Sequence, residues 1–384
     1  MSTEFSPVEN ELPLRWFRRL HLVSRNRLGV GRRAIVFAAL TALPIIVWGG
    51  LSGHLLTNAN GEPLLAHYGV LVRCLVAIPL FILAEAGFDR GVRRMAGLFT
   101  SSGIIAPAHE RAFERTISEV RALRDSSLPW VFVAGVTIAW LVANRPITHE
   151  DTYSWAALPD GGLGFGGIWY AYVVRSIFVV LLLGWLWRIV LVAWWFWRVG
   201  RLELSLVPTH PDKMGGLGFV ARLPGAFAPV TFALSAVVAS RWAHEVAFHE
   251  ASLQSFAVPA AAFLLVWAIL VLLPLLALTP ALLSARAAAI PRYSALVGHQ
   301  GRLVHQRWIE GAKVEHADIL DAPEIGPVAD AATLFDAVKH MSVVPITKMS
   351  IVSIIVPAIV PMIAVAGIRI PLKDLMLNFV KVLL

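Results

Sequence analysis

Residues 168–197 decide the fold: IWYAYVVRSIFVVLLLGWLWRIVLVAWWFW, in which Arg175 and Arg188 are the only charged side chains. The hydrocarbon core of a bilayer is about 30 Å thick, and roughly 20 apolar helical residues cross it. Within that core every backbone N–H and C=O group needs a partner, and a helix supplies all of them within one segment. The stretch therefore predicts a membrane-spanning α-helix that is long enough to tilt or to project beyond the bilayer.

The rest of the chain contains six further apolar runs, at residues 34–51, 69–88, 128–143, 223–240, 256–283 and 350–367. Hydrophobic residues make up 57% of the chain and charged residues 15%, with a mean hydropathy of +0.69. Soluble domains average about 45–50% and about 25% respectively. The 14 Trp residues agree with a membrane protein, because indole rings favour the membrane–water boundary. We predict an all-α fold: a polytopic transmembrane helical bundle with seven spans.

The basic residues are divided unequally between the connecting segments. Of the 33 Lys and Arg residues, 25 lie before the first span or after the second, fourth and sixth, whereas five lie in the alternate segments and three within spans. Cytoplasmic loops carry such an excess, so we predict a cytoplasmic N-terminus and an external C-terminus. This placement explains the net charge of +8 and predicts anionic lipid at the cytoplasmic face, and not nucleic acid, as the partner.

The spans belong to a transmembrane helical domain at residues 34–367, and the segments outside the spans are of three kinds. Residues 1–33 mix Arg with Trp and Phe and predict a basic amphipathic cytoplasmic N-terminus. Within the domain, residues 89–127 and 284–349 are predicted to form a small cytoplasmic helical layer, because apolar residues such as Phe113, Ile117 and Val120 recur at helical spacing. Residues 368–384 are too short to span the bilayer and predict an interfacial helix.

Polar residues inside the spans are the first candidate site. Arg175 and Arg188 are 13 residues apart, which is about 20 Å along a helix and less than the thickness of the bilayer core. Either both side chains extend outward to the head groups, or at least one faces the protein interior beside an acid. Glu85, near the cytoplasmic end of the second span, is the best-placed partner for Arg188. Arg73 lies near the outer end of its span and is expected to reach outward.

A second candidate is the loop HPDKMGGLGF at residues 210–219. Glycines permit left-handed backbone and close approach, so the loop could be a hinge or a backbone-amide nest for an anion. The competing interpretation is a tight turn between two spans; the loop lacks the spacing of a Walker motif. The residues that carry either interpretation are His210, Asp212, Lys213, Gly215, Gly216 and Gly218.

The third candidate is RWAHEVAFHE at residues 241–250, on the predicted outer side. Its HExxxH spacing differs from the HExxH of zinc proteases, and it places Glu245 and His249, four residues apart, on one helix face. His54 and His67 are predicted to lie on the same side. A divalent-metal site at Glu245 and His249 is one hypothesis, and a hydrated polar helix end is the alternative. We predict no cofactor.

Three segments resemble a set of uncharacterised bacterial polytopic integral membrane proteins. They are the loop at 210–219, the stretch DAPEIGPVADAATLFDAVKHM at 321–341 and the ending IPLKDLMLNFVKVLL at 370–384. The resemblance covers the second half of the chain best. It implies a multi-pass protein of the bacterial inner membrane, and it implies no activity, cofactor or catalytic residue.

The sequence favours a non-enzymatic protein that passes or senses a small solute or ion. Arg188 within a span and the prolines of the last spans, Pro274, Pro357 and Pro361, support this hypothesis, because proline kinks occur in gated helices. No predicted span holds a Lys for a retinal Schiff base. The alternative is a structural or assembly subunit of a membrane complex, and whether the chain forms a homo-oligomer stays open.

Overall fold

A computed structural model describes residues 5–9, 11–19, 28–57, 62–146, 151–159, 161–249, 251–311 and 326–368. Within this part of the chain the secondary structure is helical and no strand occurs. Seven helical segments are long and apolar enough to cross a membrane. The predictions of an all-helical fold and of seven such segments are therefore confirmed. By helix length and composition the chain is a multi-pass membrane protein.

Each of the seven segments overlaps one apolar run of the sequence. The principal helices of the spans are α2 (Val30–Leu51), α4 (Ile78–Ser101), α6 (Leu128–Ala143), α8 (Arg175–Gly200), α10 (Ala228–Phe248), α11 (Ala257–Leu276) and α14 (Lys348–Ala366). Short helices extend three of them at their N-terminal ends, namely α3 (Tyr68–Val72), α7 (Phe165–Trp169) and α9 (Leu223–Ala226). The remaining helices are α1 (Leu12–Arg19), α5 (Glu110–Asp125), α12 (Thr279–Val304) and α13 (Gly326–Lys339).

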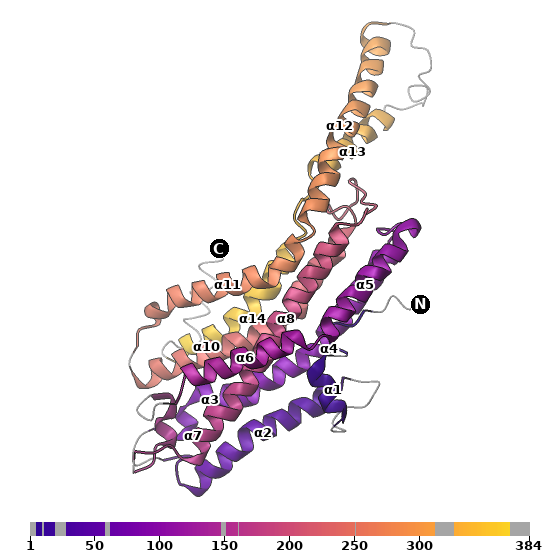
Figure 1. Ribbon diagram of the computed structural model, residues 1–384. Coiled ribbons are helices and arrows are strands. Elements are labelled where there is room, and N and C mark those ends of the chain that lie inside the picture. Colours follow the sequence, from indigo (N-terminus) through magenta and orange to yellow (C-terminus); the bar gives the residue numbers. More distant parts are fainter. Residues whose placement is uncertain are drawn as a thin grey trace.

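The sixth span is shorter than predicted. The sequence suggested that it runs to residue 283, but α11 ends at Leu276 and α12 begins at Thr279. Pro280 occupies the first turn of α12. A proline there lacks the N–H that would continue the preceding helix, and its ring would clash with the carbonyl of Leu276, four residues earlier. The chain therefore starts a new helix in a new direction (Figure 1).

The spans differ greatly in how deeply they are buried. In the most apolar stretch of the span that contains α10, 67% of the residues are buried within the protein, compared with 11% in the span that contains α11. Helix α10 packs against α14, α3 and α4, while α2 packs on α4, and α6 and α11 pack on α8. Large apolar side chains face outward from the peripheral helices, among them Ile35, Phe132 and Val258. Hydrocarbon would cover this surface in a bilayer.

The two ends of the bundle have different structures (Figure 1). At one end lie α1, α5 and the paired helices α12 and α13, which project away from the bundle. The opposite end holds α3, α7 and the C-terminal end of α2. Helix α5 buries Phe113, Ile117 and Val120 in the main core, as its spacing predicted. The predicted interfacial helix at 368–384 lies outside the described residues from 369 onward.

Several Trp residues lie in the core and not at the predicted membrane boundary. Trp155, Trp185 and Trp195 are fully buried. The Trp185 ring packs edge-on against Phe88 and Phe227, with ring centroids 5.4 and 5.8 Å apart. Because aromatic rings supply large buried areas, these Trp residues serve the packing of the helices. The composition alone could not assign them to the core.

Candidate functional site

Helix α4 carries a polar stripe on a face that is turned into the protein. Glu85, Asp89 and Arg93 follow one another at intervals of four residues and therefore share one side of the helix. Glu85 is 2% exposed and Asp89 is 5% exposed, and Phe88 between them is fully buried. A carboxylate in such surroundings needs charged or hydrogen-bonding partners. Other segments must therefore place hydrogen-bond donors or positive charges beside the carboxylates of this stripe.

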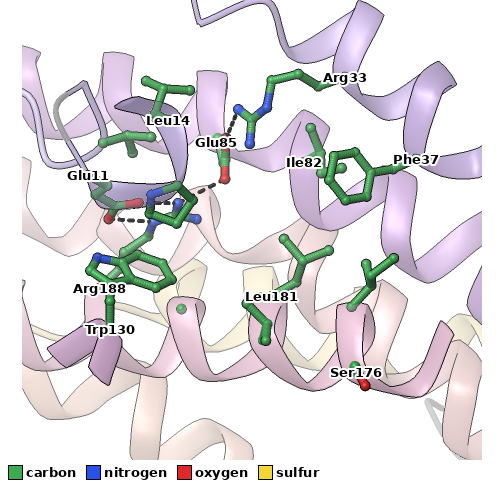
Figure 2. A pocket seen from close by; sticks show the side chains of 15 residues that line it. Glu11, Leu14, Arg33, Phe37, Ile82, Glu85, Trp130, Ser176, Leu181 and Arg188 are labelled. Carbon is green, nitrogen blue, oxygen red and sulfur yellow. Dashed lines mark hydrogen bonds and ion pairs between the residues drawn. The ribbon is translucent and has the colours of Figure 1, made fainter. Parts of the chain in front are cut away.

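Four charged side chains form a continuous chain beside α4 (Figure 2). Arg188 of α8 donates from Nε to Glu11 at 3.1 Å and from Nη2 to the other oxygen of Glu11 at 2.7 Å. The same Nη2 lies 2.8 Å from Glu85, whose second oxygen accepts from Arg33 of α2 at 2.5 Å. All four side chains are at most 5% exposed. The order is acid, base, acid, base.

The formal charges of this network sum to zero, which permits its burial. Removing a charged group from water costs several kcal/mol unless a partner of opposite charge and further hydrogen bonds compensate. Glu11 engages the guanidinium of Arg188 through two parallel bonds, the strong geometry for this pair. The guanidinium also lies 4.7 Å from the ring of Trp185, a favourable cation–π distance. The two central charges, Arg188 and Glu85, are thus each held by partners from two other elements.

Glu11, one of the two acids that pair with Arg188, comes from the N-terminal strap, by which we mean residues 5–9 and 11–19. The sequence predicted a basic amphipathic N-terminus here, and in the structure its residues Phe5, Val8 and Leu14 are buried. The ring of Phe5 packs on Trp195 of α8, with centroids 5.2 Å apart. The strap is therefore part of the core.

A second polar group anchors the strap farther along α4. Ser6 donates to Asp89. Arg93 donates to Asp89 at 2.8 Å and to Glu9 at 2.9 Å. The backbone carbonyl of Ser6 also accepts from Arg124 at the end of α5. The strap is therefore attached to α4, α5 and α8 by ionic contacts as well as by apolar packing.

An apolar cavity of about 200 Å³ adjoins the charge network. Its walls come from the strap, α2, α4, α6 and α8 and include Val8, Leu14, Phe37, Ile82, Trp130 and Leu181. Glu11, Arg33, Glu85 and Arg188 also line it. In Figure 2 these charges lie together on one side, while Leu181 and Ser176 extend away from them along α8. The space therefore combines a hydrocarbon-like wall with a charged end.

The other two intramembrane arginines have neutral partners. Arg73 donates to the Tyr170 hydroxyl at 2.5 Å and to the carbonyl of Gly69 at 3.3 Å. Arg175 donates to the Tyr153 hydroxyl and lies 4.4 Å from the ring of Trp140. The structure thus brings Arg188 together with Glu85, the pair expected from the sequence, and it places Arg73 and Arg175 elsewhere. Sequence reasoning missed Glu11 and Arg33.

The loop at 210–218 folds around its own carboxylate. Lys213, Gly215 and Gly216 have positive φ angles of 57°, 65° and 97°, which orient successive amides inward. Asp212 accepts from the N–H groups of Met214 at 2.8 Å, Gly216 at 3.1 Å and Gly218 at 2.7 Å. The amides that were predicted to bind an external anion therefore already donate to the carboxylate of Asp212. This geometry favours the turn interpretation.

The same loop contacts the segment that follows α13. The N–H of Ser342 donates to the carbonyl of Lys213 at 2.7 Å. Met341 is buried, and its methyl group would lie 3.1 Å from a Cβ added at Gly215. His210 lies beside the carboxylate, with its Nδ1 atom 2.8 Å from Asp212. The loop therefore links the α8–α10 connection to the base of the projecting helices.

Glu245 and His249, the pair predicted to bind a metal, are not among the described side chains that cluster as possible metal ligands. Glu245 accepts from Arg241 at 3.2 Å on the same helix, and His249 follows the last residue of α10. In the described part of the chain, neither belongs to a group of three close ligand-type side chains. Three other residues do form such a group: Glu62, His67 and His244.

The ion pair between Arg188 and Glu85 can be tested by a double-mutant cycle. We expect Arg188→Ala and Glu85→Ala each to lower the free energy of unfolding by about 3–5 kcal/mol, because each leaves a buried charge underpaired. The double variant should lose less than the sum, by about 1–3 kcal/mol. Unfolding titrations in mixed micelles measure all four proteins.

The matched control for this cycle is the pair formed by Arg198 and Glu119. It also involves α8, but its side chains are 35% and 44% exposed. Exposed pairs contribute about 0–1 kcal/mol, so Arg198→Ala and Glu119→Ala should have small effects. Additive losses for Arg188→Ala and Glu85→Ala would contradict the assigned pairing.

The carboxylate of Asp212 should make stability depend on pH. Partial burial raises its pKa, but the backbone N–H groups of Met214, Gly218 and Gly216 outweigh this effect and hold the pKa below its ordinary value of 3.8. A lowered folded-state pKa stabilises the protein above the unfolded-state pKa, and this contribution disappears as the pH falls through the folded-state pKa.

We therefore expect Asp212→Asn to lower the free energy of unfolding at pH 7 by about 1–3 kcal/mol, the contribution of hydrogen bonds to a charged group. Thermal unfolding of both proteins across a pH series measures this difference. The difference from the wild type should shrink below about pH 4, the range in which aspartate titrates. Asp336→Asn, at an exposed acid of α13, is the control and should change little. A difference that persists unchanged to pH 3 would contradict the role of the ionised carboxylate.

No protein-family model, curated protein or solved structure matches the chain. The resemblance to uncharacterised bacterial membrane proteins therefore stays a prediction. The function has to be argued from the geometry of the charge network and its cavity.

Proposed function

We propose that this chain is a non-enzymatic multi-pass protein of the bacterial inner membrane that senses a small amphipathic solute. The solute binds in the cavity between the strap, α2, α4, α6 and α8. One observation carries the proposal: an apolar cavity ends on a buried, charge-balanced network to which the strap contributes Glu11. A ligand with a hydrocarbon part and a carboxylate fits both features.

The size of the cavity sets the size of the ligand. A dry apolar cavity of about 150 Å³ is known to accept benzene, and this one measures about 200 Å³. A short alkyl chain or a single ring therefore fits without displacing the walls. Burial of its apolar surface provides about 25 cal/mol per Å², so a ligand of this size would bind with modest affinity.

The charged end determines the preferred head group. Arg188 uses two of its donors for Glu11, and a ligand carboxylate could accept the same two bonds. Replacing Glu11 would detach the adjacent part of the strap, because that acid accepts both hydrogen bonds from Arg188 of α8. The position of the strap would then report occupancy, as a ligand shifts a two-state equilibrium through its differential affinity.

The arrangement of the cavities supports sensing over passage. A second cavity of about 130 Å³ lies near Arg73 and His244, and it shares no lining residue with the first. The fully buried side chains of Trp185 and Phe81 lie in the core beside the charge network. A solute that binds at the strap would need a further rearrangement to cross the bundle.

Assembly is the second candidate function, and the projecting helices α12 and α13 favour it. Large apolar side chains are exposed on this projection and directly after α12, among them Trp308 by 55%, Ile309 by 73% and Leu334 by 42%. Exposed apolar residues outside the span region are typical of partner contacts. Such a partner would bind the projecting helices and respond to their position. The base of these helices contacts the 210–218 loop.

The orientation follows from the same charges as before. The predicted cytoplasmic segments include the strap, α5, α12 and α13, and these elements gather at one end of the bundle (Figure 1). An excess of Lys and Arg marks the cytoplasmic end. We therefore propose that the strap and the charge network lie toward the cytoplasm, so that the sensed solute enters from that side or from the inner leaflet.

Ligand binding can be tested with radiolabelled octanoate and the protein in lipid nanodiscs. We expect one saturable octanoate site per chain, with weaker binding of octan-1-ol, which lacks the carboxylate. Gly184 lines the cavity, and a Cβ there would already meet Trp130 at 3.3 Å. Gly184→Leu should therefore fill the space and weaken octanoate binding at least tenfold.

The matched control is Gly135→Leu on α6, because a Cβ at this exposed glycine has no atom within 4 Å. It should bind octanoate like the wild type, and empty nanodiscs give the background from lipid partitioning. Equal binding by Gly184→Leu and the wild type, or no saturable binding of octanoate, would reject the proposed ligand site.

Orientation can be tested by labelling single cysteines with a membrane-impermeant maleimide. The native Cys74 is buried and is replaced by alanine as the background. We expect Thr57→Cys, after α2, to react in intact cells, and Ser118→Cys, on the exposed face of α5, to react only after permeabilisation. The reverse pattern, or labelling of both in intact cells, would contradict the proposed topology.

A further inference from the structure

Three metal-ligand side chains converge at the end of the bundle opposite the strap. Glu62 and His67 belong to the segment that leads into α3, and His244 lies near the end of α10. The Nε2 atom of His244 is 3.2 Å from a carboxylate oxygen of Glu62, and Nδ1 of His67 is 3.9 Å from the same oxygen. One ligand atom from each of the three lies within 4.8 Å of the other two.

The hydrogen bonding of His244 identifies which nitrogen faces the acid as an acceptor. Its Nδ1 atom is 3.1 Å from the carbonyl oxygen of Ala66. A carbonyl only accepts hydrogen bonds, so Nδ1 must carry the proton. In the neutral imidazole, Nε2 then directs its lone pair toward the carboxylate of Glu62. Two acceptors at 3.2 Å require a cation between them, which is either a second proton on the ring or a metal ion.

The second imidazole is oriented in the same way. Nε2 of His67 lies 3.0 Å from the hydroxyl of Ser154, so its Nδ1 atom is directed toward Glu62. Metal-binding histidines typically use one nitrogen for the metal and hold the other by an outer hydrogen bond. Both His67 and His244 have this arrangement. His67 is 5% exposed and His244 13%, so their rings are fixed by packing as well.

We propose that Glu62, His67 and His244 form a zinc site. Two imidazole nitrogens and a carboxylate are a known ligand set for Zn²⁺, with a fourth position open to water. Tetrahedral bonds of about 2.0–2.1 Å place ligand atoms about 3.3–3.5 Å apart. The two measured separations to the Glu62 oxygen, 3.2 and 3.9 Å, require only small side-chain adjustments.

A cavity of about 130 Å³ adjoins the proposed site, and His67 and His244 line it together with Arg73 and Tyr170. The guanidinium of Arg73 gives this space a positive wall. A water molecule or a small anion on the metal would therefore find a charged neighbour. The bound metal would also join the segment before α3 to α10, the most buried span. This site is independent of the proposed octanoate site.

The test measures zinc binding by the full chain in nanodiscs, purified with a histidine-free tag. After chelator treatment and removal of the chelator, Zn²⁺ is titrated against a chromophoric competitor, and bound metal is counted by mass spectrometry. We expect one Zn²⁺ per chain, and we expect the metal to raise the melting temperature because it binds the folded state. His244→Ala and Glu62→Gln should each weaken binding at least a hundredfold. Ser154→Ala, which removes an outer hydrogen bond, should weaken it by about 10–100-fold.

His340→Ala is the control, because His340 is an exposed imidazole that follows α13, at the opposite end of the bundle from the proposed zinc site (Figure 1). It should bind Zn²⁺ like the wild type. If His244→Ala does not fold, Glu62→Gln and Ser154→Ala carry the test. No zinc uptake by the wild type above empty nanodiscs would overturn the proposal and leave a proton-bridged pair of His244 and Glu62. Unchanged affinity in both Glu62→Gln and Ser154→Ala would overturn it as well.

Discussion

The guanidinium of Arg188 sets the main constraint on this structure. It projects from a long apolar helix and is 4% exposed, so neither water nor lipid head groups can solvate it. A buried ion of this kind requires opposite charges and hydrogen bonds from the protein. Glu85 supplies one partner from the neighbouring span, but its own second oxygen then requires Arg33. Glu11 completes the balance, and for this reason the chain that precedes the first span is drawn into the core.

This chain of requirements connects elements that apolar packing alone would leave independent. The strap buries Phe5 beside Trp195, and similar apolar packing could be made by many sequences. The ionic contacts are more specific, since each donor and acceptor has a fixed position on α2, α4 or α8. Buried ion pairs often add little net stability, and in some proteins they specify one arrangement of the groups. Here they define the register of the strap against α4, and they bring the cavity wall and the strap into one unit.

The sequence was informative where the physics is local. Hydropathy located seven spans, and the position of Glu85 and Arg188 near the same ends of two spans was enough to suggest their pairing. Glu11 was missed because its role depends on the strap returning over α4, and no periodicity signals such a return. Arg33 was missed because it precedes the first apolar run and was grouped with the basic residues of the N-terminus. The 210–218 loop was ambiguous for a different reason: whether its amides face a ligand or Asp212 depends on the backbone angles at Lys213, Gly215 and Gly216. The outer histidines show the same limit, because the spacing suggested Glu245 and His249, whereas the partner of His244 is 182 positions earlier in the chain, at Glu62.

The charge balance also constrains how the network can change. Exchanging Glu11 for a ligand carboxylate conserves the number of charges and the two bonds to Arg188, so the remaining ions keep their environment. A neutral ligand would remove an acid and leave the guanidinium with Glu85 alone, while Arg33 competes for the same carboxylate. Leaving a buried charge underpaired costs about 3–5 kcal/mol, which offsets much of the gain of about 0.8 kcal/mol from each buried methylene group. The network therefore disfavours an uncharged occupant that displaces Glu11, and the charged end of the cavity sets its selectivity between head groups.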